Sequence, residues 1–217
     1  MLSFFLKILE FVFPHRSPRR DWRTVTADDL WGTAAQSTKD NVTQSTKAFV
    51  PFSYADPLIR EALHDFKYNG ATTLSRVFAT AIADTIREDV AERHVFGEEK
   101  ILVIPVPATI RRVIERGYNQ TELIARDLVS LFREHMEYCE DGVTRVKETM
   151  HQTRTVSKKD RYTNMHNAFS VPVAERVRGR DVLLLDDVIT TGATILEIAN
   201  LLTAHGARRV FSCAVAH

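Results

Sequence analysis

The chain has 217 residues, enough for one well-buried core and therefore for one domain, or for one domain with a small appendage. Hydrophobic residues make up 44% of it and charged residues 26%, a globular balance that excludes a disordered, collagen-like or coiled-coil chain. The 29 basic and 28 acidic residues nearly cancel, so a nucleic-acid site would have to be a local patch.

The first predicted element is an amphipathic helix within residues 1–13, where apolar residues recur at helical spacing. This segment is shorter than the roughly 20 apolar residues of a membrane-spanning helix and lacks the residue order of a signal peptide. We expect it to pack on its own domain; a homodimer contact and a peripheral anchor at the inner face of the membrane are the alternatives. Residues 14–47 contain few large apolar side chains and are predicted to be an irregular appendage, which places a domain boundary after residue 47.

The pattern sharpens from residue 48, with a predicted strand over residues 48–54 and two helices after it. Proline is tolerated in the first turn of a helix and glycine often follows the last, so the first helix is predicted to begin at Pro57 and end at Asn69-Gly70. The second begins at Leu74, because apolar residues recur from there at i, i+3, i+4 and i+7.

Residues 100–106 form a short apolar run, which is typical of a strand buried on both faces of a parallel sheet. Asn119 and Glu122 have the spacing of a capping arrangement and predict the start of another helix. The polar stretch 140–167 is predicted to be a mobile loop between strand ends.

The last third of the chain predicts a βαβ unit. It consists of an apolar strand over residues 181–188, a helix that stops at Gly206, and a final strand over residues 208–216. The predicted fold class is therefore α/β, with a parallel sheet flanked by helices.

The turn of this βαβ unit carries the chemistry. Asp186 and Asp187 end the strand, and the turn that opens the helix is made of Thr190, Thr191, Gly192, Ala193 and Thr194. Ligands of parallel sheets bind beyond the carboxyl ends of the strands, and free amides at a helix N-terminus bind phosphate. The carboxylates would repel that phosphate but suit the vicinal hydroxyls of a ribose, or a metal held through water. The pattern predicts a ribose 5-phosphate site; an acidic strand end with a threonine-rich cap and no ligand is the alternative.

The segment VLLLDDVITTGAT, residues 182–194, resembles the phosphoribosyl pyrophosphate (PRPP) signature of the type I phosphoribosyltransferases. Residues 105–128, 66–70 and 152–171 resemble the ComF/GntX family, the competence protein F group, so that the likeness spans about residues 50–217. Members of that family often begin with a cysteine-rich zinc module. The cysteines here are Cys139 and Cys213, too few for a four-sulfur site, so we expect no zinc and a reduced, cytoplasmic protein.

The resemblance implies a type I phosphoribosyltransferase-like fold with a small N-terminal hood, and it implies a role for each part of the motif. Asp186 and Asp187 would orient the ribose hydroxyls, and the turn 190–194 would hold the 5′-phosphate. Mg²⁺ would be held by PRPP and by the two aspartates through water, with no direct protein ligand. The loop 107–117 would meet the pyrophosphate. The basic side chains expected to contact it are Arg112, Arg116 and Lys67.

Alternatives stay open for these cations, since the arginines of residues 107–117 also fit a solvated helix start with ion pairs to Glu115 and Glu122. Lys67 also fits a solvated lysine. The basic stretch 145–161 would be the flexible loop that closes over PRPP. Its expected contact residues are Arg154, Lys158, Lys159 and Arg161.

By resemblance, the reaction would be a Mg²⁺-dependent transfer of the 5-phosphoribosyl group from PRPP to an unknown, commonly nucleobase-like, acceptor that a hood around residues 49–68 would select. The family also implies a role in DNA uptake, with single-stranded DNA or the competence helicase machinery as partners. Basic residues near 16–23 with Trp22, and the stretch 145–161, are the candidate DNA contacts. The alternative functions are a PRPP-binding competence factor without catalysis and a PRPP-sensing regulator.

Overall fold

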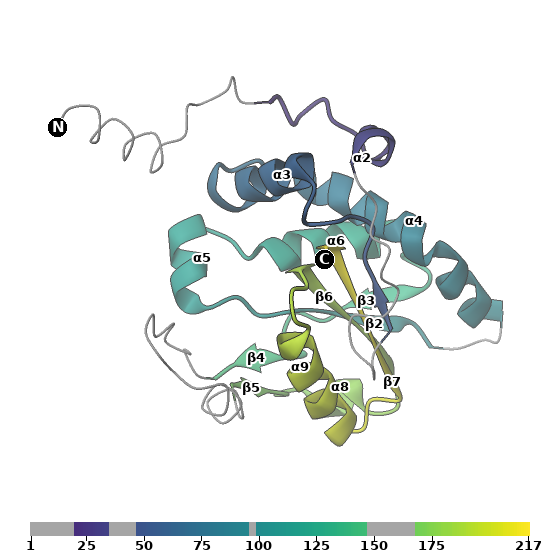
Figure 1. The fold of residues 1–217 in the computed structure, drawn as a ribbon. Helices are drawn as coiled ribbons and strands as arrows, with labels where there is room; N and C mark the ends of the chain where they lie inside the picture. Colours follow the sequence, from purple (N-terminus) through teal and green to yellow (C-terminus); the bar gives the residue numbers. More distant parts are fainter. Residues whose placement is uncertain (1–19, 35–46, 96–98, 147–167) are drawn as a thin grey trace.

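The structure, a computed structural model, describes residues 20–34, 47–95, 99–146 and 168–217, which form a parallel sheet between helical layers (Figure 1). The five-stranded sheet has the order β1-β7-β6-β2-β3, with every pair parallel. Its strands are β1 (Ala48–Phe49), β2 (Ile101–Pro105), β3 (Met136–Tyr138), β6 (Asp181–Val188) and β7 (Arg209–Ala216). A separate antiparallel pair consists of β4 (Thr144–Arg145) and β5 (Phe169–Ser170).

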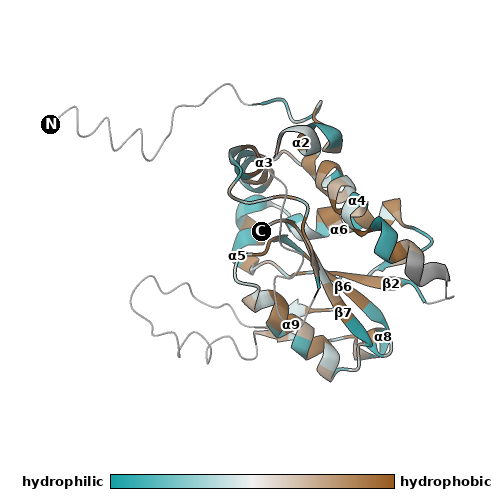
Figure 2. Ribbon diagram, turned by 45° about the vertical axis from the view of Figure 1, so that its right-hand side comes forward, coloured by the Kyte–Doolittle hydropathy of each residue, from teal (hydrophilic) through white to brown (hydrophobic). Residues whose placement is uncertain are grey.

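Helices cover both faces of the sheet. On one face lie α2 (Ala27–Thr33), α3 (Pro57–Tyr68), α4 (Leu74–Val95) and α6 (Gln120–Leu131). On the other lie α8 (Ala174–Val177) and α9 (Ala193–Ala204), while α5 (Ile110–Arg116) stands at the carboxyl ends of the strands. Along β6, Leu183 and Leu185 enter one core and Val182 and Leu184 the other, because successive side chains of a strand point to opposite faces. The central strands are therefore apolar on both sides (Figure 2).

The predicted α/β class with a parallel sheet is confirmed, and so are the main elements from residue 57 onward. Asp56 caps α3 through hydrogen bonds to the amides of Leu58 and Ile59, and Asn119 caps α6 while donating to Glu122. The strand expected over residues 48–54 is shorter, because Pro51 has no N–H to donate to a ladder. The chain nevertheless follows β7 as far as Tyr54, whose amide donates to the carbonyl of His217 at 2.9 Å.

Residues 20–34 differ from the irregular appendage that we expected. They contain α2, which begins with a capping box between Thr26 and Asp29. Trp22 is only 5% exposed, and its Nε1 donates a 2.7 Å hydrogen bond to Oδ2 of Asp65 on α3. A tryptophan and a helix thus tie this segment to the main core, whereas the helix predicted within residues 1–13 lies outside the described residues.

We expect Trp22→Phe to lower the free energy of unfolding by about 1–2 kcal/mol, because it keeps the packing but leaves a carboxylate oxygen of Asp65 without its donor. Urea unfolding at neutral pH measures this change. Trp31→Phe is the matched control, since Trp31 packs on Phe52 through its ring. Equal losses for the two variants would contradict the role of the hydrogen bond.

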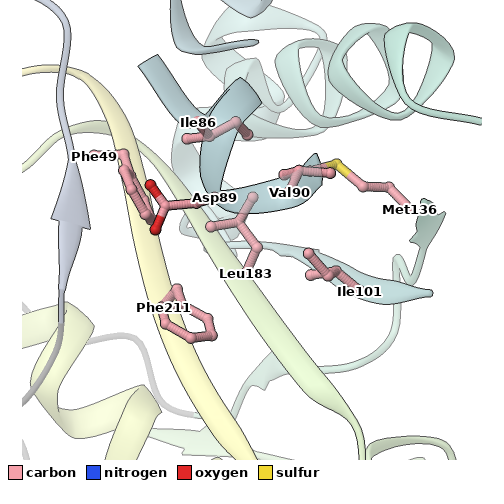
Figure 3. A pocket seen from close by; sticks show the side chains of 8 residues that line it. All are labelled: Phe49, Ile86, Asp89, Val90, Ile101, Met136, Leu183 and Phe211. Carbon is pink, nitrogen blue, oxygen red and sulfur yellow. The ribbon is translucent and has the colours of Figure 1, made fainter. Parts of the chain in front are cut away.

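A small apolar hollow lies between α4 and the amino-terminal half of the sheet (Figure 3). Asp89 borders it and is paired with Lys47 at 2.7 Å. The other side chains that line it are Phe49, Ile86, Val90, Ile101, Met136, Leu183 and Phe211. Because this lining is apolar apart from one carboxylate, it does not suit a phosphorylated ligand, and the opposite edge of the sheet is the better candidate for such a site.

Among the residues that the structure describes, none of the helices combines the length and apolarity needed to span a membrane.

Candidate functional site

The carboxyl edge of the sheet brings the two predicted acids to the surface. β6 is buried from Asp181 to Leu185 and becomes partly exposed at Asp186 and Asp187. The neighbouring strand β2 ends beside them, where the amide of Val106 donates to the carbonyl of Leu185 at 2.8 Å. The amide of Asp187 donates to Oδ1 of Asp186 at 2.8 Å. β6 is therefore buried on both faces up to Leu185, and its side chains become accessible to solvent from Asp186 onward.

The turn after β6 forms a hollow of about 230 Å³ that is open to solvent. Gly192 takes a left-handed conformation, with φ of 73°, immediately before α9. Such a φ is disfavoured for other residues, so glycine allows this abrupt start of the helix. Residues from both sides of the turn line the hollow: Asp186, Val188, Ile189, Thr190, Thr191, Gly192, Ala193, Thr194 and Ile195. The structure thus brings the predicted phosphate turn together with one of the two predicted acids.

The two aspartates have different surroundings. Asp187 forms an ion pair with Lys67 of α3, at 2.7 Å between Oδ2 and Nζ, and each side chain is 18% exposed. Burial, and then the charge of Asp187, raises the pKa of Asp186 to about 7. The amide of Asp187 and the cations Lys67 and Arg112 oppose that rise. The acid that borders the hollow is therefore the one that gains most from an added cation or hydroxyl donor.

This raised pKa predicts how stability depends on pH. Between about pH 4 and pH 7 the folded chain holds a proton on Asp186 that the unfolded chain releases, so stability falls as pH rises through that window. We expect Asp186→Asn to match the parent near pH 4 and to exceed its free energy of unfolding by roughly 3–4 kcal/mol near pH 8.

Urea unfolding at both pH values tests this expectation. The control is Asp84→Asn, which alters an exposed aspartate paired with Arg87 on α4. A gain in Asp186→Asn that is equal at the two pH values would contradict the raised pKa.

The loop expected over residues 107–117 contains the helix α5, capped by Thr109 at its start and by Gly117, with φ of 81°, at its end. Its outer face is apolar and open, with Ile110 66% and Ile114 77% exposed. Arg111 pairs with Glu115 at 2.6 Å, as the solvated-helix alternative predicted. A helix, rather than an extended loop, therefore carries the predicted pyrophosphate contacts.

The other two arginines of this segment differ. The guanidinium of Arg116 lies 4.8 Å from the ring centre of Tyr68 and donates to the side chains of Gln120 and Tyr68. The side chain of Arg112 is exposed, and its charge lowers the pKa of Asp186. Of the predicted pyrophosphate contacts, Arg112 is thus available beside the acids, whereas Lys67 and Arg116 are already engaged.

The remaining predictions concern the flexible loop and the DNA contacts. Arg154, Lys158, Lys159 and Arg161 lie outside the described residues. Trp22 cannot stack on a DNA base, because it is buried and bonded to Asp65, which corrects that part of the DNA interpretation.

The first residue of the predicted basic stretch 145–161 lies near the site, although it is not among the contact residues predicted for that stretch. Arg145, on β4, donates from Nε to the carbonyl of Pro107 at 3.5 Å and lies close enough to Asp186 for the two charges to interact. The only sequence signal for it was its position in a basic stretch.

The donor set suits a hydrated metal better than a directly bound one. In the described part of the chain, no group of three or more histidine, cysteine, aspartate or glutamate side chains is placed to hold a metal ion. Mg²⁺ prefers oxygen ligands and usually keeps several of its bound waters. Two adjacent carboxylates beside a phosphate hollow fit this coordination preference.

Cys139 and Cys213 are fully buried, and burial raises the pKa of both thiols.

Comparisons with known proteins show which family this chain is related to. Residues 124–217, which include the acids and the hollow, match the phosphoribosyl transferase domain family. The "DNA utilization protein YhgH" of Shigella flexneri is 33% identical over 161 residues, or 72% of this chain and 66% of that protein. The "Competence protein F" of Haemophilus influenzae is 35% identical over 158 residues, again 72% and 66%.

A solved glutamine PRPP amidotransferase from B. subtilis is 17% identical, with a TM-score of 0.42, over 69% of this chain and 30% of that one. The alignments with the two sequence relatives span about two thirds of the length of those proteins. With these two sequence relatives and the matched domain, the chain belongs to the competence protein F family and carries a phosphoribosyl transferase domain over residues 124–217.

Proposed function

We propose that the chain binds PRPP with Mg²⁺ and transfers its 5-phosphoribosyl group to a nucleobase-like acceptor, releasing pyrophosphate. The observation that carries this proposal is that Asp186 borders the hollow of the Thr190–Thr194 turn. A phosphate held by the turn amides and hydroxyls would leave the ribose diol within reach of the acids, which cannot bind the phosphate themselves.

In this reaction the bond between the anomeric carbon and pyrophosphate breaks, and a bond from that carbon to an acceptor nitrogen forms. The nitrogen loses its proton, and the electron pair of the broken bond leaves with pyrophosphate. When bound, Mg²⁺ would neutralise charge on the diphosphate. Asp186 and Asp187 would orient the hydroxyls and stabilise positive charge that develops on the sugar, so the chain supplies positioning and electrostatics without a covalent nucleophile.

The names of the relatives support a proposal for the cellular process in which this activity takes part. Because those proteins are called DNA utilization and competence proteins, we extend the proposal to a role in the handling of incoming DNA. One observation favours a second candidate, a PRPP-binding protein without turnover. Lys67 already neutralises Asp187, which leaves one free acid for the sugar.

Two measurements on the full chain test the proposal. Calorimetric titration with PRPP and Mg²⁺ should show binding at one site, and a panel of nucleobases should then identify an acceptor that triggers pyrophosphate release. Binding without release for every base would favour the second candidate. No heat of binding with PRPP and Mg²⁺ would refute both.

A further inference from the structure

Helix α5 presents an apolar stripe that no other described segment covers. Ile110 and Ile114 are four residues apart and therefore share one face of the helix. They are the two most exposed large apolar side chains of the described residues, and none of the seven residues of α5 is buried. A helix this short gains too little from its own hydrogen bonds to be stable in water, so its stability has to come from packing. The stripe therefore has the character of a docking surface.

The size of the stripe decides which kind of occupant fits it. Two isoleucines and the exposed Val113 beside them offer far less contact area than the roughly 800 Å² per partner that a standard interface between separate proteins buries. A segment of the same chain needs less contact area, because its tether keeps it at an effective concentration of the order of millimolar. The occupant is thus expected to belong to this chain.

We infer that residues 1–13 dock on the Ile110–Ile114 face of α5. Of the segments outside the described residues, only this one is dominated by large apolar side chains, since 10 of its 13 residues are Met, Leu, Ile, Val or Phe. The sequence predicts an amphipathic helix there that packs on its own domain, and the inference names the surface that it packs on. The inference does not depend on the proposed function.

The charges of the two helices match in one orientation. On α5, Arg111 and Glu115 are one turn apart and pair with each other at 2.6 Å. Residues 1–13 also contain one basic and one acidic residue at about this spacing, Lys7 and Glu10. When the helices run antiparallel, Lys7 lies opposite Glu115 and Glu10 opposite Arg111. Because the segment carries no excess charge, it suits a face whose own rim charges already cancel.

The chain enters the described structure close enough to α5 for this contact. Trp22 is bonded to Asp65 of α3, and one turn further along α3 the hydroxyl of Tyr68 accepts a hydrogen bond from Arg116, the last residue of α5 (Figure 1). The eight residues 14–21 span up to roughly 27 Å when extended, enough to pass from Trp22 along one helical turn to α5. Because α5 stands at the carboxyl ends of the strands, the docked segment would border the candidate site.

Crosslinking of the full chain with a short bis-maleimide tests the contact. Cys139 and Cys213 are fully buried, so only introduced cysteines react in the folded protein. We expect Lys7→Cys/Glu115→Cys to form a crosslink within one chain, which migrates faster in a denaturing gel after the reagent is quenched. The matched control is Lys7→Cys/Glu175→Cys, since Glu175 is also an exposed glutamate but lies on α8, on the other face of the sheet. The control pair should react at least about tenfold more slowly.

Ile114→Ser, added to the first cysteine pair, tests the stripe itself. If residues 1–13 cover Ile114, loss of this contact should slow the crosslink by about tenfold or more, whereas replacing a merely exposed isoleucine would leave the rate unchanged. Thermal melting shows whether each variant is folded. An unchanged rate in Ile114→Ser, or equal rates for the two cysteine pairs, would overturn the inference. A crosslink only between two chains would assign the stripe to a second copy, and no crosslink would assign it to a partner outside this chain; either result would overturn it as well.

Discussion

Asp186→Asn will lower the affinity for PRPP with Mg²⁺ by about 100-fold or more, because the carboxylate would make charge-assisted hydrogen bonds to the ribose hydroxyls worth about 1.5–3 kcal/mol each. Asp186 borders the phosphate hollow and takes part in none of the ion pairs among the described residues, so the bound ligand would be the group that favours its charged form. Calorimetric titration measures the loss. The same substitution is expected to stabilise the fold near neutral pH, which separates a binding defect from unfolding.

Asp187→Asn provides the comparison. The carboxylate of Asp187 is already paired with Lys67, so it would interact less strongly with the ribose hydroxyls. We therefore expect a smaller loss of PRPP affinity, about tenfold. Asp141→Asn, an exposed aspartate bonded to Arg176, is the control for a change of charge alone. Asp186→Asn that bound PRPP as tightly as the parent would remove the central element of the proposed function.

Gly192→Val will lower the affinity for ribose 5-phosphate by about 100-fold or more. It will also lower the free energy of unfolding by about 1–3 kcal/mol. Valine is strained at the φ of 73° that Gly192 adopts, and relief of the strain would move the amides at the start of α9. Titration with ribose 5-phosphate and urea unfolding measure the two effects on the same protein.

Gly179→Val separates strain from ligand binding. Gly179 has a φ of 74° and open space around its Cα, but it precedes β6 at the far end from the acids. Its substitution should produce a similar loss of stability and leave the affinity for ribose 5-phosphate unchanged. If both variants bound the ester normally, the turn would not be its phosphate site.

Local patterns predicted much of the site because each part of it is local. Apolar residues on both faces of a strand predict β6, and the acids, threonines and glycine that follow are adjacent in sequence, so a helix start and its phosphate hollow need no distant partner. The ends of α3 and α6 were predictable for the same reason, because Asp56 and Asn119 bond to amides two and three residues away.

Contacts between distant segments were not predictable. Nothing near Lys67 in the sequence indicates Asp187, which is brought to it by the packing of α3 over the sheet edge. Trp22 lies in a polar stretch that predicts an irregular appendage and a DNA contact, yet its partner Asp65 is a buried residue of α3. In the sequence, Arg145 is one of several basic residues in a row of similar ones. Only the folded structure shows that its guanidinium packs on the ring of Phe169 from β5.

The sequence by itself determined the parallel α/β architecture and the phosphate turn with its adjacent acids, because hydrophobic periodicity, caps and turns act over a few residues. The tertiary structure decided which charges meet. It paired Lys67 with one acid, placed Asp186 at the hollow, and brought Arg145 close enough to Arg112 for their charges to interact. Electrostatic energies depend on distance and burial, and the fold sets both for residues far apart in the chain.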